Sequence, residues 1–142
     1  MHTVIKLAGI ALALAVGFFA SDIARWFDTG DSRLSLDQYC VLSSQPCSQS
    51  NVTMTLNQNT AQPLVPVQIS VQWPQAQSET LRLDLEGLEM EMGRARFVLK
   101  AVGNQRYEGE VLLPVCTQNE MTWLGELSDG HQTVYPAIRM KR

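Results

Sequence analysis

Between Val52 and Met140, apolar residues of this chain recur at every second position in a series of short runs, and this period constrains the fold more than any other feature. Leu81, Leu83 and Leu85, for example, alternate with polar and charged residues. Such alternation places one set of side chains on one face, as a half-buried antiparallel strand requires. The runs of this kind cover residues 52–56, 65–73, 81–85, 94–101, 107–113, 122–127 and 133–140.

Seven short runs without a convincing helix between them predict an all-β domain. The specific expectation is an immunoglobulin-like antiparallel sandwich of about seven strands. An open barrel is the alternative. Gly103-Asn104 is a turn signal between residues 94–101 and 107–113, so these two runs are expected to pair as a hairpin.

The N-terminal segment determines the expected compartment. Residues 7–20 (LAGIALALAVGFFA) carry no charge, and the helical apolar spacing continues to Phe27. We therefore predict an uncleaved N-terminal transmembrane helix over residues 1–27, with a cleaved signal peptide as the alternative. Cleavage after Ala20 would need a small residue where Phe18 stands.

The charges that flank this segment give its orientation. Lys6 lies on the short N-terminal side, and the other side is not enriched in positive charge. This bias favours a single-pass protein of the bacterial inner membrane with its C-terminal domain in the periplasm. Residues 28–38 form a polar linker, and residues 39–142 form the expected periplasmic β-domain.

Charge and motifs exclude several functional classes. The formal net charge is −3, and the lysines and arginines are scattered, so a nucleic-acid partner is not expected. The chain contains no GxSxG, HExxH, GxGxxG or P-loop pattern. We therefore expect neither an enzyme nor a small-molecule substrate.

Three cysteines remain to be explained. Cys40 and Cys47 enclose a six-residue gap, and in an oxidising compartment so close a pair is expected to form a disulfide. Cys116 is then left as a free thiol. The alternative, in which Cys116 pairs with Cys40 or with Cys47, stays open at this stage.

Sulfur atoms also form the candidate chemical site. On a strand, Met90 and Met92 would point to one face, and Cys116 and Met121 flank a polar turn near one end of the sheet. If these ends meet, three thioethers and one thiolate converge, and soft sulfur ligands select Cu(I). His131 could add a nitrogen ligand. The competing interpretation is that the methionines and the cysteine simply pack in the core.

Residues 63–127 resemble the FixH/YtkA-like proteins. The resemblance rests on the single N-terminal span, on the Met-x-Met-Gly of Met90 to Gly93, and on the hairpin stretch from Asn104 to Gly109. It implies a membrane-tethered protein associated with the assembly of copper-containing respiratory oxidases. It also implies a copper-handling edge at Met90 and Met92, with Cys116 and Met121 nearby. The Cys40–Cys47 loop departs from that family's pattern.

Two functions follow as expectations. The first is a Cu(I)-binding assembly factor for a respiratory oxidase, in which Met90, Met92, Cys116 and Met121 form one partly exposed cluster. The second is a non-enzymatic interaction module, or an accessory subunit of an inner-membrane complex, in which the methionines are buried. Both place the partner in a membrane protein complex.

Overall fold

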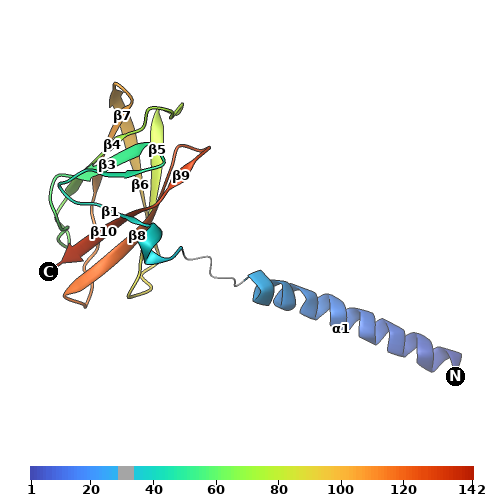
Figure 1. Ribbon diagram of the computed structural model, residues 1–142. Coiled ribbons are helices and arrows are strands. Elements are labelled where there is room, and N and C mark those ends of the chain that lie inside the picture. The colour runs from blue at the N-terminus through green and yellow to red at the C-terminus, as the bar shows by residue number, and fades with distance from the viewer. Residues whose placement is uncertain (29–33) are drawn as a thin grey trace. The chain divides into compact units, whose positions relative to one another are not determined.

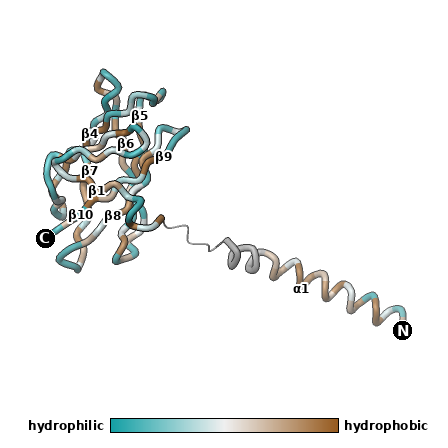
Figure 2. Tube along the Cα trace, in the orientation of Figure 1, coloured by the Kyte–Doolittle hydropathy of each residue, from teal (hydrophilic) through white to brown (hydrophobic). Residues whose placement is uncertain are grey.

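The computed structural model describes residues 1–28 and 34–142; the side chains of residues 21–28 are not described. Most of the predicted linker, residues 29–33, therefore lies outside the described residues. The chain divides into two compact units, Met1–Leu34 and Ser35–Arg142. The first contains the helix α1 (His2–Asp28). Its segment His2–Ala20 is long and apolar enough to cross a membrane, and none of it is buried (Figure 2).

The second unit is built from strands, as predicted. After a short 3-10 helix, η1 (Leu36–Gln38), it contains ten strands (Figure 1). These are β1 (Cys40–Val41), β2 (Cys47–Gln49), β3 (Val52–Leu56), β4 (Val67–Gln72), β5 (Thr80–Gly87), β6 (Arg94–Gly103), β7 (Arg106–Val111), β8 (Glu120–Ser128), β9 (Thr133–Val134) and β10 (Pro136–Lys141).

The all-β prediction is confirmed, but its strand number was too low. All seven predicted runs correspond to strands; β1 and β2 are additional, and the last run is divided into β9 and β10. The division falls at Tyr135-Pro136, where proline lacks the N–H that a continuous ladder needs. The strands form one hydrogen-bonded sheet in the order β1-β10-β8-β5-β6-β7-β4-β3-β2, with β9 beside β8. The immunoglobulin-like sandwich is not confirmed by this order.

The two ends of the sheet meet, so that the sheet is nearly a barrel. β1 and β2 are its terminal strands, and a disulfide joins Cys40 of β1 to Cys47 of β2. Next to this seam, Ala61 forms a parallel bridge with Met140 of β10. The Leu56 amide at the end of β3 donates to the Ser43 carbonyl, 2.8 Å away. The barrel is therefore closed by short segments that flank the regular strands.

The interior holds the residues that the period-two pattern selected. Leu81, Leu83 and Leu85 of β5 are fully buried, and the alternate positions of β3 and β4 are buried in the same way. Trp73 and Trp123, each 1% exposed, are the largest buried side chains. Burial of apolar area at about 25 cal/mol per Å² is the main stabilising contribution in such a core.

The predicted hairpin joins β6 to β7. Asn104 and Gln105 both have left-handed backbones, with φ of 53° and 60°, as a two-residue type I′ turn requires. The ladder is short, because β7 pairs with β6 only over Lys100 to Gly103. In contrast, β6 pairs with β5 over its whole stretch from Arg94 to Lys100. Within residues 34–142, no strand pairs with the other side of β6 before Lys100.

Candidate functional site

The predicted sulfur site lies where β5 ends and β8 begins. These strands are antiparallel neighbours, with Gly87 paired to Trp123. The segment that follows β5, residues 88–93, carries Met90 and Met92. It is a loop and not a strand, so the expectation that Met90 and Met92 share one face of a strand was wrong. Gly93, with φ of 77°, reverses the chain before β6.

Two hydrogen bonds dock this loop on β8. The Leu88 amide donates to the Thr122 carbonyl at 2.9 Å, and the Thr122 amide donates to Glu89 Oε2 at 2.8 Å. The loop is therefore fixed to the strand that carries Met121. The Glu89 carboxylate therefore accepts a main-chain hydrogen bond from β8, unlike a carboxylate that contacts only solvent.

Met121 is a core residue. It is 2% exposed and lies across from Met140 of β10. A Cβ added at Gly87 would lie 2.1 Å from Met121 Cε and 2.6 Å from the Met90 carbonyl oxygen. The Met121 methyl group and the Met90 main chain therefore both occupy the space that the missing side chain of Gly87 leaves open.

Cys116 is a free, buried thiol in the segment between β7 and β8. It is 4% exposed, and its Sγ donates to the Gln118 carbonyl oxygen at 3.3 Å. Cys116 and Met121 belong to the same hydrophobic core, as does the half-buried Met90 at its margin. Met92 is 37% exposed. The structure thus brings Met90 to Met121, whereas Met92 lies in the solvent-exposed part of the loop.

The predicted nitrogen ligand, His131, lies far from this site. His131 follows the far end of β8, about 25 Å from Met121 at the rise of an extended strand. Among the side chains described, those of residues 1–20 and 34–142, no group of three or more histidine, cysteine, aspartate or glutamate residues could hold a metal ion. Without His131, the predicted ligands of Cu(I) are the sulfur atoms of Met90, Met92, Cys116 and Met121.

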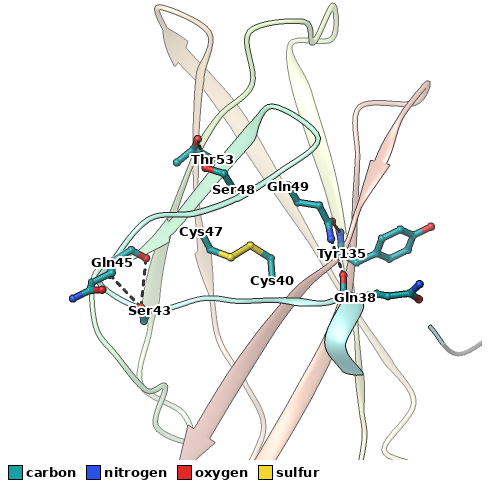
Figure 3. Close-up of a disulfide and its surroundings, with 9 residues drawn as sticks. All are labelled: Gln38, Cys40, Ser43, Gln45, Cys47, Ser48, Gln49, Thr53 and Tyr135. Carbon is teal, nitrogen blue, oxygen red and sulfur yellow. Dashed lines mark hydrogen bonds between the residues drawn. A yellow bond between two sulfur atoms is a disulfide. The ribbon is translucent and has the colours of Figure 1, made fainter. Parts of the chain in front are cut away.

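The disulfide predicted from sequence is present and lies at the seam of the barrel (Figure 3). The Cα atoms of Cys40 and Cys47 are 6.0 Å apart, within the usual range. Gln49 of β2 reinforces the seam: its Nε2 donates to the Gln38 carbonyl at 2.7 Å, and the Tyr135 amide donates to its Oε1 at 2.6 Å. The sequence gives no local signal for this role, because the partners of Gln49 lie before β1 and before β10.

The outer face of β5 and β6 carries a ladder of ion pairs. Asp84 is 7% exposed, and its carboxylate binds Arg96 Nε at 2.6 Å and Arg82 Nε at 3.1 Å. Glu86 faces Arg94 at 3.6 Å. Asp84 and Glu86 are therefore paired with arginines of β6 across the strands, and Asp84 also with Arg82 of its own strand.

Two titratable groups have perturbed pKa values. Burial, and secondarily the charge of Asp129, raises the pKa of Tyr107 above its ordinary value. The Tyr107 hydroxyl donates to the Ser78 carbonyl oxygen. The pKa of Asp129 is lowered: partial burial opposes this shift, but the amides of Gln132 and His131 donate to its carboxylate and prevail. Both groups have structural reasons for their shifts.

An open groove of about 390 Å³ lies on the outer face of β3 and β4. Hydroxyl and amide side chains dominate its lining, with Arg106 at one side. Arg106 is bound by Glu108 at 2.7 Å. The groove therefore presents hydroxyl, amide and ion-paired guanidinium groups.

Comparison of the chain with protein-family models, with curated proteins and with solved structures gave no match.

Proposed function

We propose that this chain is a membrane-anchored, non-enzymatic interaction module, a scaffold or accessory subunit of a membrane protein complex. Its β-domain acts in the periplasm, and α1 holds it at the bacterial inner membrane. The helix supports this proposal by its length and apolar composition. The disulfide supports it because such bonds persist in oxidising compartments and are rare in the cytosol.

The observation that carries the proposal is the burial of Met121 and Cys116. An interaction module predicts that these residues pack in the core, and they are 2% and 4% exposed. The Met121 methyl group fills space beside Gly87, as a packing residue does. A copper-transfer site would need its sulfur atoms within reach of a partner, and these two would have to be uncovered first.

A group of exposed aliphatic residues supports binding to another protein. Leu64, Val65, Leu112 and Val115 are each at least 40% exposed. The segments that carry them are joined by a hydrogen bond, because the Leu64 amide donates to the Leu113 carbonyl at 2.9 Å. Leu64 has a left-handed backbone, with φ of 56°, which is unfavourable for a bulky residue. Gathered apolar residues on a surface are typical of an interaction site.

Photo-crosslinking in membranes tests the proposal. A photoreactive residue is placed at Leu112 of the full chain, with Thr55 on the polar face of β3 as the matched control position. We expect a discrete crosslinked membrane protein from position 112 and a much weaker product from position 55. Absence of any membrane-protein product from position 112, in membranes where the chain is correctly inserted, would contradict the proposal.

A Cu(I)-binding assembly factor is the second candidate. The position of the Met90 main chain and the Met121 methyl group, both beside Gly87, favours it, because two of the four predicted ligand residues have parts at one place. The resemblance to FixH/YtkA-like proteins points the same way. In this function, Met90, Met92, Cys116 and Met121 bind Cu(I) after the 88–93 loop moves.

A Cu(I) competition titration separates the two functions. The full, reduced chain in detergent is titrated against a chromophoric chelator, next to Cys116→Ser and Met92→Ala. Tight one-to-one binding that is lost in both variants would establish the copper function. We expect no Cu(I) binding by the folded chain. That result would exclude the copper function and support the interaction module.

A further inference from the structure

One edge of β6, on the side opposite β5, is unpaired over most of its length and suggests where a partner binds. β6 is ten residues long, yet only its last part pairs with β7. The regular pairing of the two strands ends at Lys100 and Glu108, and the next residue of β7, Gly109, still lies against Leu99 and Val98. A Cβ there would lie 2.9 Å from Leu99 Cγ and 3.2 Å from the Val98 carbonyl oxygen, so the closest approach of the strands already needs glycine. Before Val98, the side of β6 opposite β5 has no strand beside it within residues 34–142.

The hydrogen-bonding pattern identifies the groups that this edge presents. The Ala101 amide donates to the Glu79 carbonyl at 2.9 Å, toward the β5 side. Successive residues of a strand alternate in the direction of their amide and carbonyl groups. The main-chain groups of Arg94 and Arg96 and the N–H of Val98 are therefore directed away from β5, toward the side without a strand, whereas the Val98 carbonyl lies against Gly109 of β7. A row of such groups is a template for one more strand.

The side chains of β6 indicate which peptide would fit. On the outer face stand Arg94, Arg96, Val98 and Lys100, all of them exposed, with three positive charges among four residues. On the inner face stand Ala95 and Phe97, which are only partly covered by the core. An added strand therefore meets cations on one face and apolar surface on the other.

β5, which already pairs with β6, has the alternation of acidic and apolar residues that an added strand would need. β5 places Asp84 and Glu86 opposite Arg96 and Arg94, and it places Leu83 opposite Phe97. The Asp84 carboxylate approaches Arg96 Nε at 2.6 Å, and the Glu86 carboxylate approaches Arg94 Nε at 3.6 Å. A guanidinium offers five N–H donors, so each retains donors for a second carboxylate.

We propose that the β6 edge at Arg94–Val98 binds an extended segment of a partner protein in which acidic and apolar residues alternate. This inference rests on the proposed interaction function and specifies its site and partner chemistry. The segment adds to the sheet as a strand, with its main chain bonded to Arg94, Arg96 and Val98. Its acidic residues face the arginines and Lys100, and its apolar residues cover Ala95 and Phe97. Main-chain bonds give such complexes their affinity, and side chains give their specificity.

The binding test uses synthetic peptides and the full chain in detergent. The probe is a fluorescent ten-residue peptide of alternating glutamate and valine, measured by anisotropy. A peptide with lysine in place of glutamate is the charge control. Two further peptides are N-methylated at one or the other set of alternate residues. We expect saturable binding of the probe, and a loss of more than about tenfold with lysine. One methylated peptide should bind, and the other should not.

Two protein variants locate the site. Lys100→Glu should weaken binding of the glutamate peptide about fivefold, whereas Arg139→Glu, an equal charge change on β10, should have less than about a twofold effect. Val98→Pro removes an edge N–H and should abolish binding. Proline is tolerated on sheet edges, and unchanged thermal unfolding of the variant confirms its fold. The N-methylated peptides give the same information without altering the protein.

The outcomes separate this inference from the general function. If all the peptides bind alike, or none binds, the β6 edge is not the site, even where position 112 crosslinks to a membrane protein. If the glutamate peptide binds as described but no position crosslinks in membranes, the edge chemistry stands and the proposed function falls.

Discussion

Removal of the disulfide is the perturbation whose magnitude follows most directly from the structure. Cys40 and Cys47 are separated by 7 residues, so the bond closes a short loop of the unfolded chain. Chain-entropy estimates for a loop of this size give about 2.4 kcal/mol of stabilisation. The double variant Cys40→Ala/Cys47→Ala should lose about this much free energy of unfolding. For a domain of this size, that corresponds to a decrease in Tm of about 10 °C or more.

The domain should nevertheless stay folded without the bond. The Gln49 hydrogen bonds to Gln38 and Tyr135 still link β2 to the segments beside β1 and β10. A loss of about 2.4 kcal/mol is smaller than the 5–15 kcal/mol typical of natural domains. The seam should therefore weaken while the rest of the barrel keeps its structure.

Urea unfolding in detergent, followed by tryptophan fluorescence, measures this loss. Trp73 and Trp123 are 1% exposed, so unfolding transfers both to water. Reduction of the wild-type chain should reproduce the effect of the double variant. Cys116→Ala, which keeps the disulfide, is the control and should respond to reductant as the wild type does. A loss below about 1 kcal/mol, or no response of the wild type to reductant, would show that this disulfide does not stabilise the closed sheet.

Three further predictions concern packing, the seam and pH. Met121→Ala should cost about 2–5 kcal/mol and Gly87→Ala about 1–3 kcal/mol. Because the Met121 methyl group occupies the space that a Cβ at position 87 would need, the double variant should cost less than the sum of the single losses, and additive losses in urea unfolding would contradict this packing. Gln49→Ala should cost about 1–3 kcal/mol through its two seam hydrogen bonds, and an unchanged midpoint would exclude this role. The raised pKa of Tyr107 contributes stability that is complete below about pH 10 and is lost as the pH rises through the higher native value. Tyr107→Phe should flatten this alkaline loss between pH 9 and 11, and an equally steep loss in the variant would assign it to other groups.

The strands were predictable wherever burial on one face imposed a period of two. Val52, Met54 and Leu56 alternate with threonines and became β3, and the long run around Leu83 became β5. β1 and β2 were missed because two or three residues are too short for a period to be recognised. Their strand character comes from partners that are distant in sequence, which no local pattern records.

The candidate site was predictable in its location but not in its geometry. The sequence placed Cys116 and Met121 near one end of the sheet, and Met90 does approach Met121 there. The strand expected through Met90 and Met92 was wrong, because the hydrogen bond from the Thr122 amide to Glu89 and the left-handed Gly93 favour a docked loop. Alternation within one short segment could not distinguish these two conformations.

The parallel pairing of β1 with β10 has a consequence for the order of folding. Cys40 lies beside Pro136, so almost the whole domain separates the two partners along the chain. Strand pairing between such distant segments forms slowly. The long loop between them must close, at a cost in conformational entropy, before the stabilising contacts can form. In the proposed periplasmic location, the N-terminal cysteines and β2 would cross the membrane long before β10, so the disulfide would be able to form before the barrel closes. Insertion of β10 between β1 and β8 is then the final step, and until it occurs the edge of β8 remains open to pairing with another chain.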